Sequence, residues 1–376
     1  MSRLDLRGLR APEEDAAQER SWPAVRDAFA ARERVPRRLS RRRGALALAA
    51  VAAVGVAATP PGMAIAGYLH DRVVRDTPRP TVPAPLATRT PGRLLLTTGA
   101  GVWVLRGDGS GRLLGRYTSA TWSPNGRFVA VIRDNALYAV EPATGTVRWP
   151  LVRSGALRDV RWAPKDGFRI AYREDDDLRI VDGDGTRDRL LARAIGAAPP
   201  AWRPGTHVLA YDAGGGIVKV VDVDRGTTGS LPVTGRVRSL LYSADGRRLL
   251  VATTTGLLVL DPATGAPPRL LSPAPTAIAT SAGAPADVVA VLAGGRVRRV
   301  ALDGSGDRPV ATVPGATEVA WSPDGRTVLV PDPARDRWHL VDAVTGADRT
   351  LERIGERLDP DGLGSASFPA IGGWCC

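Results

Sequence analysis

The amino-acid sequence predicts an all-β fold, a seven-bladed β-propeller of four-stranded antiparallel blades, preceded by a single N-terminal transmembrane helix and a proline-rich linker. A Trp-Ser-Pro-Gly type of motif recurs along residues 93–369, and its first four copies lie 40 residues apart. Glycine-containing turns recur every 39 to 42 residues between β-rich runs. A period of this length in a strand-rich chain is typical of propellers.

Residues 1–43 form the predicted cytoplasmic segment and carry 12 arginine and 7 acidic side chains. Ser21 can cap a short helix in this segment, because a serine hydroxyl accepts hydrogen bonds from N–H groups of the first turn. Trp22, Val25 and Phe29 then share one helix face at positions i, i+3 and i+7. We predict that this face docks on a cytoplasmic partner or lies on the membrane surface.

Residues 44–69 form the predicted transmembrane helix. The segment holds 26 residues without a charge, and about 20 helical residues cross a bilayer core. Arginines within 37–43 precede it, so the N-terminus is expected in the cytoplasm and the propeller outside. Pro60 and Pro61 weigh against a long straight helix. The alternative is secretion after signal-peptide cleavage, because Ala64-Ile65-Ala66 resembles a small-residue cleavage site.

Residues 70–92 form the predicted linker. Five prolines lie among threonine and arginine between positions 78 and 91. Prolines at this density favour an extended polyproline II stalk of about 3.1 Å per residue. The propeller is then expected over residues 93–369, followed by a short tail at 370–376.

Each repeat is expected to supply four strands, with the motif aromatic at the end of the first strand. A glycine turn separates the first two strands and another separates the last two, which gives a four-stranded antiparallel blade. We predict that the motif aromatics bury their rings between blades and form core, not a ligand cage. These aromatics are Trp122, Trp162, Trp202, Tyr242, Trp321 and Phe368.

The blade count depends on two incomplete copies. The copy around residues 280–283 lacks the aromatic but keeps the period, so it counts as a blade. Residues 93–118 supply only the last three strands of a blade. Ser365 to Pro369 lies near the C-terminus and resembles the motif, so we expect it to supply the missing strand. This gives seven blades, with six as the rival count, and closure removes the exposed sheet edge.

The motif Trp321-Ser322-Pro323-Asp324-Gly325 and its copies resemble the WD-like and TolB-like propeller repeats of bacterial envelope proteins. The resemblance covers residues 93–369 and implies a propeller that binds proteins, peptides or sugars, although some relatives are hydrolases. The Gly-His and Trp-Asp dipeptides of eukaryotic WD repeats are absent. The stretch Ala139 to Trp149 resembles the tryptophan-docking repeat of quinoprotein propellers, which implies a tryptophan that locks adjacent blades and no quinone.

Composition argues against nucleic-acid binding. The formal net charge is +12, but only 2 of the 51 basic residues are lysines, at 165 and 219. An arginine excess beside abundant alanine, glycine and proline is what a GC-rich genome produces. In the predicted propeller the arginines are dispersed among acidic residues, with no basic strip interleaved with aromatics.

No catalytic, cofactor or metal residues are predicted. The chain has three histidines, His70, His207 and His339, and lacks the Gly-x-Ser-x-Gly and His-Glu-x-x-His motifs. The acidic run at 174–177 is interpreted as a solvated turn in preference to a calcium site. The only cysteines, at 375 and 376, can form a vicinal disulfide, link two chains or have no role.

Three functions follow as hypotheses. The favoured one is a non-catalytic, membrane-anchored, extracytoplasmic propeller that binds a protein, peptide or glycan. The second is a signalling regulator, because the layout of cytoplasmic helix, span and external domain resembles that of transmembrane anti-sigma factors, without their His-x-x-x-Cys-x-x-Cys motif. The third is an envelope hydrolase or lyase, which would need carboxylates converging at one mouth of the propeller.

Overall fold

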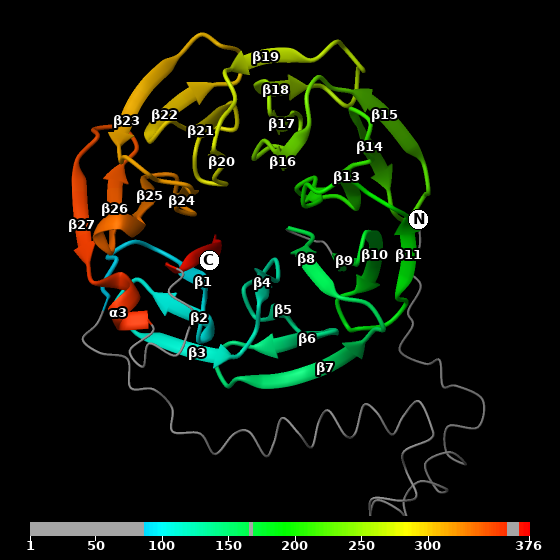
Figure 1. Ribbon diagram of the computed structural model, residues 1–376, viewed down its shortest axis with the longest axis horizontal. Coiled ribbons are helices and arrows are strands. Elements are labelled where there is room, and N and C mark those ends of the chain that lie inside the picture. The colour runs from blue at the N-terminus through cyan, green and yellow to red at the C-terminus, as the bar shows by residue number, and fades with distance from the viewer. Residues whose placement is uncertain (1–85, 165–167, 359–367) are drawn as a thin grey trace, which may run out of the picture. The chain divides into compact units, whose positions relative to one another are not determined.

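The chain folds into seven four-stranded antiparallel sheets arranged around a central axis (Figure 1). The computed structural model describes residues 86–164, 168–358 and 368–376. The predicted all-β, seven-bladed fold is confirmed, and the six-bladed count is excluded. The predicted span at 44–69 lies outside the described residues, and no helix among the described residues is long and apolar enough to cross a membrane.

Blades 2 to 7 each take four consecutive strands. In chain order these are β4 (Ser119–Trp122), β5 (Val129–Arg133), β6 (Ala136–Glu141), β7 (Thr146–Val152); β8 (Leu157–Trp162), β9 (Arg169–Glu174), β10 (Asp177–Asp182), β11 (Arg189–Ala192); β12 (Ala201–Trp202), β13 (Val208–Asp212), β14 (Ile217–Asp222), β15 (Thr228–Pro232); β16 (Val237–Tyr242), β17 (Leu249–Thr253), β18 (Leu257–Leu260), β19 (Arg269–Ser272); β20 (Ala277–Ala279), β21 (Val288–Ala293), β22 (Arg296–Ala301), β23 (Asp307–Thr312); and β24 (Ala320–Trp321), β25 (Thr327–Asp332), β26 (Arg337–Asp342), β27 (Asp348–Glu352). A 3-10 turn η2 (Pro333–Arg335) joins β25 to β26, and helix α3 (Ile354–Leu358) follows β27.

Blade 1 is built from both ends of the described chain. Its innermost strand is β28 (Ala370–Cys375), which pairs with β1 (Arg93–Thr98). The remaining strands are β2 (Gly101–Arg106) and β3 (Gly111–Gly115). The C-terminus therefore supplies the strand that residues 93–118 lack, and the ring of innermost strands closes (Figure 1).

The closing strand differs from the prediction in its position. It begins at Ala370, so residues 370–375 belong to blade 1 and not to a tail, and Phe368 precedes the strand. Trp374 lies opposite Leu94, as Trp122 lies opposite Val129, so Trp374 holds the position assigned to Phe368. The side chain of Phe368 packs instead at the edge of the apolar cluster between blades 7 and 1.

The motif of blade 1 is divided between the two ends of the propeller sequence, which explains why Phe368 was predicted in place of Trp374. Trp374 comes from the C-terminus, whereas Pro91, Gly92 and Arg93 supply the turn and the start of the second strand. Gly92 has a φ of +87°, and a Cβ there would lie 2.6 Å from the carbonyl oxygen of Cys375, so glycine is required. A search for one contiguous motif cannot detect a copy whose halves lie at opposite ends.

Polar contacts fasten β28 on both sides. The indole N–H of Trp374 donates to the carbonyl of Pro91 at 3.1 Å, and the Ile371 N–H donates to Glu318 of blade 7 at 3.0 Å. Burial raises the pKa of the Glu318 carboxyl. Arg93 lies over the ring of Trp122 in blade 2. Cys375 and Cys376 form a vicinal disulfide.

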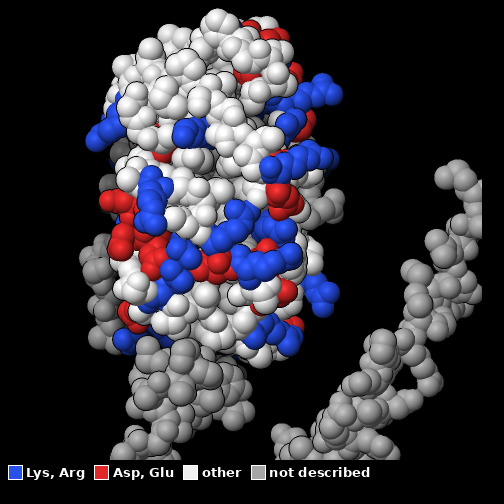
Figure 2. Space-filling model, turned by 90° about the vertical axis from the view of Figure 1, so that its right-hand side faces the viewer, with Lys and Arg blue, Asp and Glu red and all other residues white. Residues whose placement is uncertain are grey.

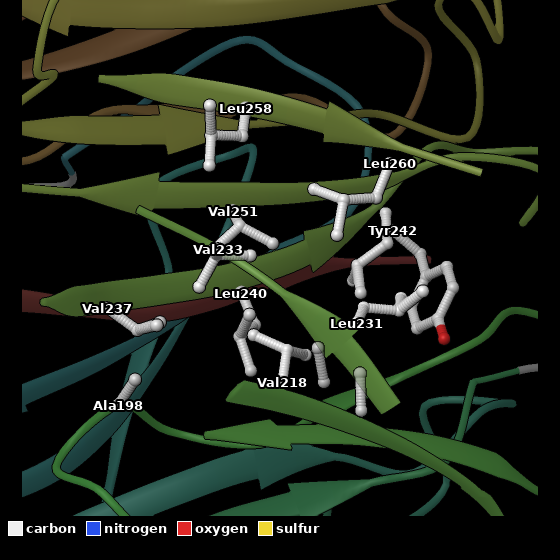
Figure 3. Close-up of a cluster of buried hydrophobic side chains, with 13 residues drawn as sticks. Ala198, Val218, Leu231, Val233, Val237, Leu240, Tyr242, Val251, Leu258 and Leu260 are labelled. Atoms are coloured by element: carbon white, nitrogen blue, oxygen red, sulfur yellow. The ribbon is translucent and has the colours of Figure 1, made fainter. Parts of the chain in front are cut away.

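The core consists of seven apolar clusters, each shared by two neighbouring blades. Figure 3 shows the cluster between blades 4 and 5, where Leu231 and Val218 meet Leu240, Tyr242 and Val251. Both faces of a blade are covered in this arrangement, so its second strand can be buried along its whole length, as every residue of β17 is. Because each blade depends on both neighbours, closure of the ring determines whether the first and last clusters form.

The repeated motif builds a turn that satisfies its own polar groups. In blade 7 the hydroxyl of Ser322 donates to Asp324 at 2.5 Å and accepts from the Thr327 N–H at 2.9 Å. Asp324 also accepts from the Arg326 N–H, and Gly325, with a φ of +72°, donates to the Ser322 carbonyl. Ser322 is fully buried, so an unpaired hydroxyl or N–H there would cost stability. Blades 2 and 5 repeat the same bonds, which explains why the motif recurs.

In the turn between the third and fourth strands of blade 7, a carboxylate accepts backbone hydrogen bonds, so the stability of the turn is expected to depend on pH. The N–H groups of Thr345 and Val344 donate to Asp342 and lower the pKa of its carboxyl. A pKa that is lower in the folded state contributes stability above the unfolded value, about 3.9, and that contribution is lost as pH falls through the folded pKa. We expect the difference in melting temperature between wild type and Asp342→Asn to be positive at pH 7 and to shrink below about pH 4.

The control is Ser230→Ala, which alters an exposed residue of β15 and removes no titrating group. Its difference from wild type should not depend on pH. A constant difference for Asp342→Asn between pH 7 and pH 3 would show that the carboxylate charge does not stabilise this turn.

Candidate functional site

The blade topology gives the propeller two different faces. The turns between first and second strands and between third and fourth strands lie on one side, which we call the turn face. The turns between second and third strands, and the connections from one blade to the next, lie on the other, the loop face. Between blades 3 and 4 the turn face is hollowed by a depression of about 730 Å³, which we call the 3–4 groove. Its lining residues are Arg169, Asp182, Arg187, Asp188, Arg189, Val223, Asp224, Arg225 and Gly226.

Two hairpin turns position the arginines of the groove. The turn between β10 and β11 carries Arg187, with a φ of +53°, and Arg189 begins β11. The turn between β14 and β15 carries Arg225, and its shape is held by Asp222, whose carboxylate accepts from the N–H groups of Asp224 and Arg225 at 3.1 Å each. The same turn types recur in other blades, so ordinary blade geometry brings these arginines together.

A nearly buried carboxylate forms the floor of the groove. The side chain of Asp182 is 4% exposed and accepts from Arg169 at 3.0 Å and from Nε of Arg187 at 2.6 Å. Arg169 also reaches Asp224 of blade 4 at 3.1 Å, so one guanidinium joins the two blades. A buried carboxylate must be paired to remain charged, and these contacts provide the pairing.

His207 lies at the rim, where its Nδ1 hydrogen-bonds Asp224. Burial acts to raise the pKa of Asp224, but the hydrogen bond from His207 and the charge of Arg169 outweigh it, so the pKa lies below its ordinary value. Asp224 is therefore ionised near neutral pH. His339, the other described histidine, contacts Asp348 at 2.6 Å on blade 7, far along the chain from the groove.

An exposed aromatic lies across the β10–β11 turn from the groove. Phe168 is 46% exposed, and its ring packs on Gly183. Trp149 of blade 2 packs its ring on Gly185 and donates its indole N–H to the Gly183 carbonyl at 3.0 Å. The tryptophan that resembles a docking residue therefore joins blade 2 to blade 3.

A second polar cluster occupies the loop face of blade 3. Glu174 pairs with Arg153 at 2.9 Å. The next two pairs are Asp176 with Arg158 at 2.7 Å and Asp177 with Arg193 at 3.3 Å. Burial acts to raise the pKa of Glu174, but hydrogen bonds from Arg153 and the Gly155 N–H leave it lowered. In the described residues no group of three or more His, Cys, Asp or Glu side chains is placed to hold a metal ion.

Arginine and acidic side chains alternate over the outer side of blades 3 and 4. Figure 2 views the propeller from the side of β11 and β15 and shows blue and red side chains interspersed in a band, beside a largely uncharged region. The charges of blade 3 are therefore concentrated but mixed in sign. Such a surface does not present the uniform positive field that a nucleic acid requires.

The motif aromatics lie in the core and do not line the groove. Trp122, Trp162, Trp202, Tyr242 and Trp321 are buried, each in a cluster shared with the preceding blade. The helix face of Trp22, Val25 and Phe29 lies outside the described residues. The groove was not predicted from the sequence, because Arg187 and Arg225 are 38 residues apart and belong to no motif. The sequence signal for the groove is an arginine in the turn between the third and fourth strands of two consecutive blades.

Comparisons with known proteins support the fold. No protein-family model matches the chain, and a search of curated proteins finds no match. Among solved structures, the β-propeller domain of Cps50 (Swd1) from Myceliophteria thermophila matches with a TM-score of 0.52 and 18% identity, over 63% of this chain and 85% of that one. The WD40 domain of Pan2 from Neurospora crassa gives a TM-score of 0.49 and 14% identity, over 62% and 78%. The similarity to the Cps50 domain supports a WD40-type propeller fold with seven blades, although the repeats of this chain lack the Trp-Asp dipeptide.

Proposed function

We propose that this chain is a non-catalytic binding protein whose propeller recognises a protein partner. The observation that carries this proposal is the 3–4 groove, where arginines from two blades project from turns on a rigid sheet scaffold. Arginine is enriched in protein interfaces and among the residues that dominate binding energy. Function on a propeller resides in such local sites and not in the fold itself.

The side chains that catalysis would use are engaged in structural contacts. Asp182 and Asp224 hold arginines, and His207 and His339 are paired with aspartates. On the loop face Glu174 is held by arginine in the same way. These contacts fix turns and join blades, so the geometry supports binding better than hydrolysis.

We further propose that residues 44–69 hold the chain in a membrane with the propeller on the extracytoplasmic side. The support is the uncharged segment of 26 residues, the arginines before it, and the proline-rich linker at 70–92. A single span would confine the propeller to one side of the membrane and so restrict which partners it meets.

The chain offers a direct test of this orientation. Its only cysteines, Cys375 and Cys376, both lie in or beside β28. After intact cells that express the full chain are treated with a membrane-impermeant reductant, an impermeant maleimide should label this protein. Labelling only after the membrane is opened would contradict the orientation, and a protein that alkaline carbonate releases from the membrane would contradict the anchor.

The binding function has its own test. Photocrosslinking in the native membrane, with a reactive amino acid at a groove position, should give one reproducible adduct. The control places the same amino acid at Leu270, which is exposed on β19 in blade 5. An absence of adducts from every position on either face would contradict a binding function.

A further inference from the structure

The 3–4 groove separates its charges by depth. The side chain of Asp182 is 4% exposed, whereas that of Arg187, which it holds, is 70% exposed. Arg225 is 81% exposed and is held by Asp222 at 3.3 Å. Arg189 is exposed and donates to the Val223 carbonyl. The Asp182 carboxylate therefore lies at the floor, whereas Arg187, Arg189 and Arg225 lie at the rim, together with the carboxylate of Asp224, which is 41% exposed.

The contacts within the groove leave donors for a ligand. A guanidinium has five N–H groups. Arg187 uses two of its nitrogens on Asp182, Arg225 uses one on Asp222, and Arg189 uses one on a carbonyl. The floor carboxylate has both of its oxygens occupied, since one accepts from Arg169 and the other from Arg187. The groove can therefore donate to a ligand more readily than it can accept.

We propose that the 3–4 groove binds an acidic peptide segment of a protein partner, with Arg187, Arg189 and Arg225 pairing its carboxylates. Contacts with Asp182, Asp222 and the Val223 carbonyl hold the three guanidinium groups in place before binding, which reduces the entropy lost when they pair with a carboxylate. The geometry of a guanidinium fits a carboxylate through two parallel hydrogen bonds. This proposal rests on the proposed binding function and names its site and ligand.

The groove suits a peptide better than a small anion or a polyanion. Its volume of about 730 Å³ exceeds that of a single carboxylate or phosphate, and its arginines come from two blades. The exposed carboxylate of Asp224 lies among the arginines and would repel a chain with uniform negative charge. A peptide with acidic residues spaced by neutral ones meets the arginines and avoids Asp224.

Binding to the full chain can be measured by fluorescence anisotropy with a labelled peptide of alternating Glu and Gly. The test variant is Arg187→Gln with Arg225→Gln. The matched control is Arg148→Gln with Arg247→Gln, which removes two exposed arginines, one from strand β7 of blade 2 and one from the first turn of blade 5. The net charge changes equally in both variants. Arg187→Gln removes one partner of the buried Asp182 carboxylate, which keeps its ion pair with Arg169, whereas the other three arginines pair at the surface. We therefore expect a lower melting temperature for the groove variant than for the control, and binding is compared at a temperature where both variants are folded.

We expect the groove variant to weaken binding about 10-fold or more, because it removes two charge-assisted contacts, and the control to stay within about 2-fold of wild type. A Gln-Gly peptide should not bind. Equal weakening in both variants would overturn the proposal in favour of general charge attraction, and absence of wild-type binding would overturn it directly. Displacement of the peptide by inorganic phosphate at the same concentration would indicate a site for small anions and would also overturn the proposal.

The two proposals fail in different ways. If photocrosslinking gives the same partner adduct with wild type and with the groove variant, the binding function stands and the groove is not its site. If no adduct forms from any position, the binding function itself fails, whatever the peptide measurement shows.

Discussion

Deleting residues 370–376 is expected to destabilise the propeller and to expose a sheet edge that promotes aggregation. The deletion removes β28, which pairs with β1 at five positions, and with it the burial of Trp374 and the bond from Ile371 to Glu318. It also leaves the inner edge of β1 unpaired, although Leu94 to Leu96 are buried there. Trp374 is half-buried, so the largest loss comes from the five unpaired positions of β1 together with the exposed apolar side chains beneath them. A chain of this size then melts at least about 10 °C lower, and the exposed edge favours aggregation.

The measurement is the thermal transition followed by circular dichroism, together with size-exclusion chromatography of the full chain and the deletion variant. A synthetic peptide of residues 368–376 added in trans should restore part of the lost stability, because the site that receives β28 lies on the remaining chain. The matched control, Cys375→Ser with Cys376→Ser, keeps the strand and Trp374. A deletion variant that stays monomeric with a wild-type melting temperature would show that β28 does not close the ring.

Replacing Trp202 by alanine is expected to destabilise the propeller by about 3 to 5 kcal/mol. Trp202 is 6% exposed and packs in the cluster between blades 3 and 4, together with Ile180, Leu209 and Tyr211. Its indole N–H also donates to the Arg161 carbonyl of blade 3 at 2.9 Å. Truncation therefore opens a cavity between two blades and removes a hydrogen bond between them.

Trp202→Phe separates the two contributions. It keeps most of the ring burial but loses the hydrogen bond, so it should cost about 1 to 2 kcal/mol. Urea denaturation of the full chain followed by tryptophan fluorescence gives both values from the transition midpoints. Leu270→Ala removes an exposed apolar side chain from β19 and should change stability by no more than about 0.5 kcal/mol. A loss below 1 kcal/mol for Trp202→Ala would mean that the motif aromatics are not the core of the blade contacts.

The site was less predictable than the fold, and the reason is physical. A propeller repeats one packing problem, so most blades carry an aromatic before the first turn and a glycine within it, as Trp321 and Gly325 show, although blade 6 lacks the aromatic. Those requirements leave a period that the sequence displays. Arg187 and Arg225 solve no repeated packing problem, because each is exposed and set by its local turn.

The sequence by itself determined that this chain is a propeller of four-stranded blades, because the spacing of aromatics and glycine turns reflects contacts within one blade and its neighbour. Only the tertiary structure decided how the ring closes, because β28 and β1 lie at opposite ends of the propeller and share one split motif. The structure also decided which charges meet: Arg169 joins Asp182 in its own blade to Asp224 in the next. Contacts between residues far apart in sequence leave no period, so only the folded chain brings the 3–4 groove together.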